Sequence, residues 1–135
     1  MSGTSLDGLD IALCRFKKAN NGYKFKVLAA QTIPYSVALK SKLKKAYSSK
    51  AVDLVKLNHE FGKYLGESTS KFLKAHKLKA DAISSHGHTI FHQPKLGYTT
   101  QIGCGATIAA ITKTTTVCDL RSLDIALKGQ GAPLV

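Results

Sequence analysis

The sequence contains no tryptophan, one methionine and only two arginines, and its apolar runs are all short. No run approaches the roughly 18 residues of a membrane-spanning helix, so we expect no membrane partner. The first residues lack the basic segment and long apolar core of a signal peptide. The three cysteines, Cys14, Cys104 and Cys118, form no C-x-x-C pair, which argues against a disulfide framework and a structural zinc site. Reduced thiols in the cytoplasm are the expected state.

Acidic residues are scarce as well, and the formal net charge is +12. Residues 17–79 carry the whole excess, with 15 lysines against Asp53, Glu60 and Glu67. A basic face can indicate a nucleic-acid partner. Arginine, the better reader of bases and phosphates, is nearly absent, and we expect no exposed aromatics for base stacking to be interleaved with the lysines. We therefore favour a solvated lysine surface over a nucleic-acid partner, and keep a basic nucleic-acid or anionic-surface binding domain as the alternative function.

The 135 residues are enough for one domain, and 44% of them are hydrophobic. Residues 8–16 and 23–33 alternate between apolar and polar side chains, which predicts two strands. The sequence Asn20-Asn21-Gly22 between them favours a tight turn with positive φ. These patterns predict an antiparallel hairpin at the start of the chain.

Helical spacing follows the hairpin. It predicts helices over 36–49 and 51–76, the second with an apolar stripe that includes Phe61 and Leu65. Gly62 and Gly66 interrupt that helix, and we expect a close helix–sheet approach to compensate for them. Further strands are expected at 80–87, 88–94, 98–103 and 115–120, and short helices at 104–114 and 121–129. The order predicts an α/β mixed sheet in which the later strands are parallel.

The first candidate site is the opening segment, which contains Gly3, Thr4, Ser5, Leu6, Asp7, Gly8, Leu9 and Asp10. Two glycines permit a tight turn whose consecutive N–H groups could bind an anion. Thr4 and Ser5 add hydroxyl donors, and Asp7 or Asp10 could hold Mg²⁺ directly or through water. By composition alone, such a segment is more often an ordinary turn than a phosphate-binding one. The Walker phosphate-binding pattern, G-x-x-x-x-G-K-[ST], does not occur in the sequence.

Two further clusters could carry chemistry. His86, His88 and His92 lie in "SHGHTIFH", where a zinc pair is one interpretation and polar contact with a sugar or phosphate at a strand end is the favoured one. Gly87 predicts a bend between the first two rings. In "DLRSLDIALKGQG", Arg121 could bind a carboxylate bidentately, and the neighbouring glycines could equally be helix caps.

Taken in order, the segments "MSGTSLDGLD", "TIPY", "SHGHTIFHQP", "TTQIG" and "VCDLRSLDIALKGQGAPLV" resemble the anhydro-N-acetylmuramic acid kinase family, over essentially the whole chain. That family belongs to the sugar kinase/Hsp70/actin superfamily. The resemblance implies an actin-like, ribonuclease H-like α/β mixed sheet flanked by helices. Residues 1–135 would be a partial N-terminal ATPase domain, without the strand that precedes the first turn and without the second domain.

The resemblance also implies a reaction. The family uses ATP and Mg²⁺, opens the ring of 1,6-anhydro-N-acetylmuramic acid by hydrolysis and phosphorylates the sugar to N-acetylmuramic acid 6-phosphate in peptidoglycan recycling. Gly3 to Asp10 match its ATP-phosphate motif, with Asp7 or Asp10 near Mg²⁺, through water. Arg121 matches a sugar-site arginine suited to the lactyl carboxylate, and Gly87, His88 and Thr89 match a sugar-proximal turn.

Some features depart from the family pattern or lie outside the chain. The family's catalytic base is an aspartate downstream of G-Q-G-A-P-L, so the base is expected beyond Val135, no catalytic residue is assigned here and the fragment alone is expected to be inactive. With one flanking strand missing, we expect the opening turn to be poorly anchored. His88 stands where glutamine is common, Cys104 where aspartate is common and Lys128 where glycine is common. A homodimer of the full-length protein stays open.

Overall fold

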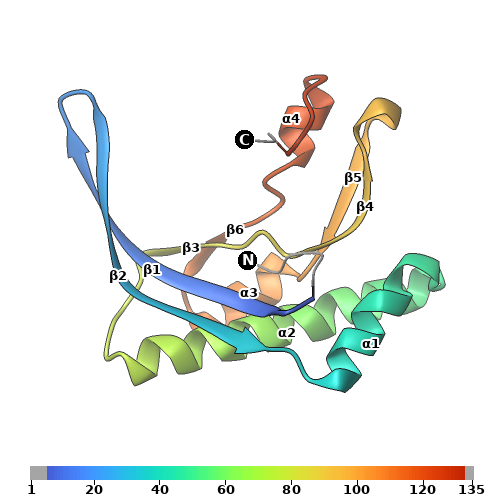
Figure 1. Cartoon of the computed structure of the whole chain (residues 1–135), viewed down its shortest axis with the longest axis horizontal. Coiled ribbons are helices and arrows are strands. Elements are labelled where there is room, and N and C mark those ends of the chain that lie inside the picture. Colours follow the sequence, from blue (N-terminus) through green and yellow to red (C-terminus); the bar gives the residue numbers. More distant parts are fainter. Residues whose placement is uncertain (1–5, 133–135) are drawn as a thin grey trace.

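The computed structural model describes residues 6–132, in which strands and helices follow one another along the chain (Figure 1). The strands are β1 (Gly8–Ala19), β2 (Gly22–Pro34), β3 (Ala82–Ser84), β4 (His88–Gln93), β5 (Tyr98–Ile102) and β6 (Thr115–Val117). The α-helices are α1 (Val37–Lys45), α2 (Ala51–Ala75), α3 (Gly105–Thr112) and α4 (Ser122–Ala126), and the 3-10 helices are η1 (Ala46–Ser48) and η2 (Pro94–Leu96). The mixed α/β class is thereby confirmed.

The predicted hairpin is present and is longer than the alternation indicated. Its antiparallel register runs from Gly8 opposite Pro34 to Ala19 opposite Gly22. The positive φ of the turn falls on Gly22, at 120°, and not on the two asparagines. The far half of the hairpin reaches away from the rest of the chain (Figure 1), and Phe25 on it is 70% exposed. Only the near half therefore contributes to the core. Phe25 lies between two lysines, so the expectation of no exposed aromatics among the lysines is wrong.

Helix α2 is the long helix that the apolar stripe predicts, and Leu57, Phe61 and Leu65 on that stripe are buried. The expected close helix–sheet approach is wrong. A Cβ atom added to Gly62 would lie 2.8 Å from the backbone nitrogen of Cys104, directly before α3, and one added to Gly66 would meet Ile111 of α3 at 3.1 Å. The two glycines let α2 and α3 approach each other, which offsets their low helix propensity.

The strands form three two-stranded sheets within residues 6–132, not one mixed sheet. β1 pairs with β2 antiparallel, β3 with β6 parallel, and β4 with β5 antiparallel. The expectation that all later strands are parallel is therefore wrong for β4 and β5. Only the short η2 turn and Gly97 connect them, and a parallel pair needs a crossover of a dozen or more residues.

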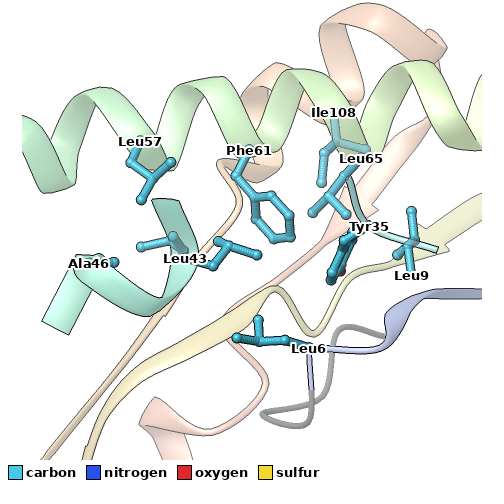
Figure 2. Close-up of a cluster of buried hydrophobic side chains, with 10 residues drawn as sticks. Leu6, Leu9, Tyr35, Leu43, Ala46, Leu57, Phe61, Leu65 and Ile108 are labelled. Atoms are coloured by element: carbon cyan, nitrogen blue, oxygen red, sulfur yellow. The ribbon is translucent and has the colours of Figure 1, made fainter. Parts of the chain in front are cut away.

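The core lies where α2, the N-terminal end of β1 and the C-terminal end of α1 meet (Figure 2). Phe61 is its centre, with an exposed fraction of 0%. Its ring stacks on Tyr64 at a centroid separation of 6.0 Å and meets Tyr35 edge-on at 6.2 Å. Among residues 6–132, none of the helices combines the length and apolarity needed to cross a bilayer.

Candidate functional site

The opening turn is described from Leu6 onward, and the predicted ligands Gly3, Thr4 and Ser5 lie outside the described residues. Leu6 has a left-handed backbone, with φ 59°, and its side chain is 7% exposed in the core (Figure 2). Leu9 is buried in the same cluster. The expectation of weak anchoring is therefore wrong for residues 6–10, because two leucines attach this segment to the core.

The two aspartates of this turn point away from that core. Asp7 is exposed, and its carbonyl oxygen accepts a hydrogen bond from the Tyr35 backbone N–H at 3.4 Å. Asp10 is exposed as well, and one of its carboxylate oxygens accepts the Thr32 hydroxyl at 2.6 Å. Nowhere in residues 6–132 do three potential metal-ligating side chains come together. Exposed carboxylates of this kind suit Mg²⁺, which keeps several waters and takes one or two carboxylates together with substrate phosphates.

The catalytic base falls outside the part of the chain that the structure describes. The resemblance puts this aspartate beyond Val135, and Val135 itself lies outside the described residues. No side chain within residues 6–132 is therefore assigned as the base. Its position downstream of Val135 stays a prediction.

A second polar region forms around Gly87, between β3 and β4. Gly87 has φ +69°, which confirms the predicted bend, and an added Cβ atom would lie 2.4 Å from the Ile102 carbonyl oxygen. Thr89 is half-buried opposite Gln101. The Gln101 amide donates to Thr99 Oγ1 at 2.7 Å, while its Oε1 is buried without a hydrogen-bond partner among residues 6–132. That oxygen is an acceptor available to a ligand.

His88 lies deeper than a typical sugar-contacting side chain. It is 5% exposed, and its ring meets Phe61 edge-on with centroids 6.3 Å apart. The contact places the imidazole against the core, and its role toward a sugar stays a prediction.

His86 is the polar residue that the resemblance did not assign to the sugar site. Its Nδ1 lies 3.1 Å from the Gly87 carbonyl oxygen, so Nδ1–H donates there and leaves Nε2 as an acceptor. Nε2 is buried and has no partner in the described part of the chain. Burial lowers the pKa of His86, its bond to Gly87 partly opposes this, and the positive charge of Arg121 lowers the pKa further. The repeated histidines of "SHGH" were the sequence signal for this residue.

Arg121 reaches the same region from the segment between β6 and α4, which packs against β5. The acidic neighbours in its loop accept hydrogen bonds from other residues of that loop. Asp119 accepts the Ser122 hydroxyl at 2.5 Å, and Asp124 accepts the Gly131 N–H at 2.6 Å. Within residues 6–132 Arg121 forms no ion pair, and it is half-buried. A half-buried guanidinium without a carboxylate partner suits an anionic ligand.

One prediction tests whether His86 and Arg121 share a site. Arg121→Gln should raise the pKa of His86, because the cation disfavours the imidazolium form. Arg15→Gln, on the distant hairpin, should leave it unchanged. An NMR titration of the imidazole measures both. Since folding lowers the pKa of His86, its contribution to stability is present above about pH 6.5 and is lost as the pH falls through the folded-state value. Equal pKa values of His86 in the two variants would show that His86 and Arg121 do not share a site.

The sequence profile of one protein family, described as anhydro-N-acetylmuramic acid kinase, matches residues 1–135, the whole chain. The chain belongs to this kinase family.

Curated members of the anhydro-N-acetylmuramic acid kinase family match along the same length. The chain is 38% identical over 141 residues to the enzyme of Microcystis aeruginosa (strain NIES-843 / IAM M-2473), covering 100% of this chain and 37% of the relative. It is 39% identical over 146 residues to that of Bacillus cereus (strain AH187), covering 100% and 38%. It is 38% identical over 148 residues to that of Pseudoalteromonas translucida (strain TAC 125), covering 99% and 37%. The chain thus spans little more than a third of these kinases.

Two of the departures expected from the resemblance have a structural context. Lys128, where the resemblance leads us to expect a glycine, has a left-handed backbone with φ 70°. Glycine adopts that conformation freely, whereas a residue with a Cβ atom does so at a cost of about 1–2 kcal/mol. Cys104, where the resemblance leads us to expect an aspartate, is the N-cap of α3. The Thr107 hydroxyl lowers the pKa of the Cys104 thiol, burial opposes this, and the backbone N–H groups of Thr107 and Ala106 lower it again. A thiolate at Cys104 would accept hydrogen bonds from this hydroxyl and these N–H groups, as a carboxylate would.

A second prediction concerns this thiol. Thr107→Val should move the pH at which Cys104 is half-maximally alkylated upward, because the hydroxyl that stabilises the thiolate is removed. Thr112→Val is the matched control on the same helix, since that hydroxyl donates to the Ile108 carbonyl at 2.9 Å. Iodoacetamide labelling across a pH series, read by peptide mass spectrometry, distinguishes them. An unchanged pH dependence of Cys104 alkylation in Thr107→Val would show that the Thr107 hydroxyl does not lower the pKa of the thiol.

Proposed function

We propose that this chain is the N-terminal, actin-like part of a two-domain, cytoplasmic kinase that uses ATP and Mg²⁺. The full-length protein would open the ring of 1,6-anhydro-N-acetylmuramic acid with water and phosphorylate it to N-acetylmuramic acid 6-phosphate in peptidoglycan recycling. The observation that carries this proposal is the family match over all 135 residues. The curated relatives bear the same kinase name.

The region around Gly87 would hold the sugar. Arg121 would bind the lactyl carboxylate, and this role is supported by its half-buried guanidinium without an ion-pair partner in residues 6–132. The acceptors His86 Nε2 and Gln101 Oε1 would take hydroxyl or amide donors of the sugar. The Gly87 bend brings the backbone close to Ile102 and leaves Thr89 beside Gln101 at the edge of this region.

The opening turn would hold the phosphates of ATP. Gly3 to Gly8 would supply backbone N–H donors, and Thr4 and Ser5 hydroxyl donors. Asp7 and Asp10, both exposed, would hold Mg²⁺ through water. When bound, the ion would neutralise charge on the transferring phosphate. The anchoring of Leu6 and Leu9 in the core would keep this turn in place.

The chemistry divides between two steps. A water attacks the anomeric carbon, and the bond from that carbon to the bridging oxygen of the sugar breaks. This sugar oxygen then attacks the γ-phosphorus of ATP, whose bond to the β–γ bridging oxygen breaks to release ADP. The base that deprotonates the water would come from beyond Val135, so this chain contributes positioning. Arg121 would hold the sugar by its carboxylate, a contact made equally in the ground state and in the transition state.

The full-length protein tests the proposal. Incubated with ATP, Mg²⁺ and the anhydro sugar, it should form the 6-phosphate, measured by mass spectrometry and by ADP release. The 135-residue chain alone should form none. A full-length protein that shows no turnover of this sugar would overturn the assignment.

A variant of Arg121 tests how the carboxylate of the sugar is recognised. Arg121→Gln in the full-length protein should raise KM for the acidic sugar about 30-fold, equivalent to ~2 kcal/mol for a charged hydrogen bond. The value of kcat should change little, because a contact made equally in ground and transition states is lost. Arg15→Gln, the only other arginine of residues 1–135, should behave like the unsubstituted protein. A KM that is insensitive to Arg121 would exclude it from the carboxylate subsite.

A further inference from the structure

The loop between β5 and α3 is held to helix α2 by one asparagine. The side-chain oxygen of Asn58, Oδ1, accepts the Gly103 backbone N–H at 2.8 Å, and the Asn58 carbonyl oxygen accepts the Cys104 N–H at 3.1 Å. Asparagine is a weaker helix former than alanine or leucine, yet Asn58 stands half-buried in the interior of α2. The two bonds therefore give this residue a role outside its own helix.

The bond to Oδ1 fixes the orientation of one peptide group. The N–H of Gly103 and the carbonyl of Ile102 belong to the same planar unit and point in opposite directions. While the N–H is turned toward α2, the carbonyl oxygen lies against Gly87, where an added Cβ atom would be 2.4 Å from it. Asn58 thus determines which way the Ile102 carbonyl points.

Gly103 makes an external hold on this peptide group necessary. Its φ is +120°, and a glycine leaves such a conformation for others at little cost. The residue is buried, and a Cβ atom added to it would lie 2.8 Å from the Leu65 side chain and 3.5 Å from the Gly87 Cα. Since the loop is this close to Gly87, rotation of the peptide group would displace that residue.

Gly87 connects the loop to the candidate sugar site. Its carbonyl oxygen accepts the Nδ1–H of His86, which leaves Nε2 as a buried acceptor without a partner in residues 6–132. Gln101, next to Ile102 on β5, supplies the second buried acceptor, Oε1. Both acceptors are therefore attached to backbone that meets at the Ile102 carbonyl.

We propose that Asn58 is a positioning residue for the sugar. By holding the Gly103 N–H, it keeps the neighbouring carbonyl against Gly87 and so presents the two buried acceptors in one orientation. Acceptors that are oriented in advance lose less freedom when donors of the sugar bind to them, and this strengthens binding. The inference rests on the function proposed above.

Substitutions in the full-length protein separate the side-chain acceptor of Asn58 from its backbone bond. Asn58→Leu and Asn58→Ala remove Oδ1 and retain the carbonyl bond to Cys104, and the alanine variant serves if leucine does not fit. Asn58→Asp retains an oxygen acceptor of the same shape. His59→Leu is the matched control, because it removes another contact between α2 and α3, from His59 Nδ1 to Thr107 Oγ1 at 3.3 Å, and leaves the Gly103 N–H bound.

The first two measurements need no ligand. In Asn58→Leu and Asn58→Ala the Gly103 amide should exchange with solvent at least about tenfold faster, because its acceptor is lost. The pKa of His86 should rise toward the ordinary histidine value, because the burial that lowers it is partly relieved when Gly87 moves. Asn58→Asp and His59→Leu should match the unsubstituted protein. Amide exchange and imidazole titration are both followed by NMR.

Enzyme kinetics test the connection to the sugar. KM for the anhydro sugar should rise about tenfold in Asn58→Leu and Asn58→Ala, while kcat and KM for ATP change little, since contacts made equally in the ground and transition states are weakened. Asn58→Asp should keep KM within about twofold of the unsubstituted value. A protein that turns over none of this sugar would overturn the proposed function, whereas the exchange and titration results would still decide whether Asn58 orients the two acceptors.

The inference about Asn58 fails under any of three results. One is a His86 pKa in Asn58→Leu and Asn58→Ala that equals the value in His59→Leu. Another is an Asn58→Asp variant whose KM for the sugar rises as far as that of Asn58→Leu, since the acceptor would then not be the cause. The last is a rise in KM for ATP equal to the rise for the sugar, which would indicate a general loss of structure.

Discussion

Replacing Phe61 with alanine is expected to destabilise the protein by about 3–5 kcal/mol. The side chain is fully buried and contacts three aromatic rings, those of Tyr35, Tyr64 and His88. Its removal leaves a cavity among side chains from α2, β4 and the residue that follows β2, which cannot all move inward together. Since the total free energy of unfolding of a domain is about 5–15 kcal/mol, this change is a large fraction of it.

Urea denaturation followed by circular dichroism measures the loss. The control is Phe25→Ala, the same chemical change at a side chain that is 70% exposed on the hairpin. It should change the free energy of unfolding by no more than about 0.5 kcal/mol. Similar losses in the two variants would mean that the core is not centred on Phe61.

Replacing Gly87 with alanine is the second change with a large expected effect, about 2–4 kcal/mol. The positive φ of +69° costs a residue with a Cβ atom about 1–2 kcal/mol. The added atom would also lie 2.4 Å from the Ile102 carbonyl oxygen, which is backbone and cannot rotate away. The start of β4 would have to move from β5, and His86 would move with it.

Gly97→Ala separates these two causes. Gly97 has φ +81° in the turn between β4 and β5, and an added Cβ atom there meets nothing within 4 Å. It should show only the cost of the positive φ, about 1–2 kcal/mol. Urea denaturation gives the stabilities, and the NMR shift of the His86 imidazole reports whether the polar region has moved. Equal effects of the two variants on both measurements would contradict the role of the close approach.

The candidate site was only partly predictable from the sequence. Arg121 and Gly87 were named from the resemblance, and the structure brings the first within electrostatic reach of His86, next to the second. His86 was noted only as a member of a histidine cluster, for which polar contact with a sugar or phosphate was favoured over a zinc pair, because a histidine's partners cannot be inferred from its spacing. His88 was expected at the sugar, and its burial against Phe61 depends on where α2 lies.

The sequence by itself determined the elements that have a strong local period. The hairpin and α2 follow from alternation and from an apolar stripe, since each strand or helix repeats its own geometry residue by residue. Family membership was likewise carried by short ordered motifs and is confirmed over residues 1–135.

Only the tertiary structure decided how these elements meet. Leu6 and Leu9 anchor residues 6–10 because α2 and Tyr35 come to them from distant parts of the chain. The glycines of α2 face α3 and not a sheet, and the strands separate into three pairs with a groove between β1 and β3. Such contacts join residues tens of positions apart, and their energies depend on burial and close packing, which no local period encodes.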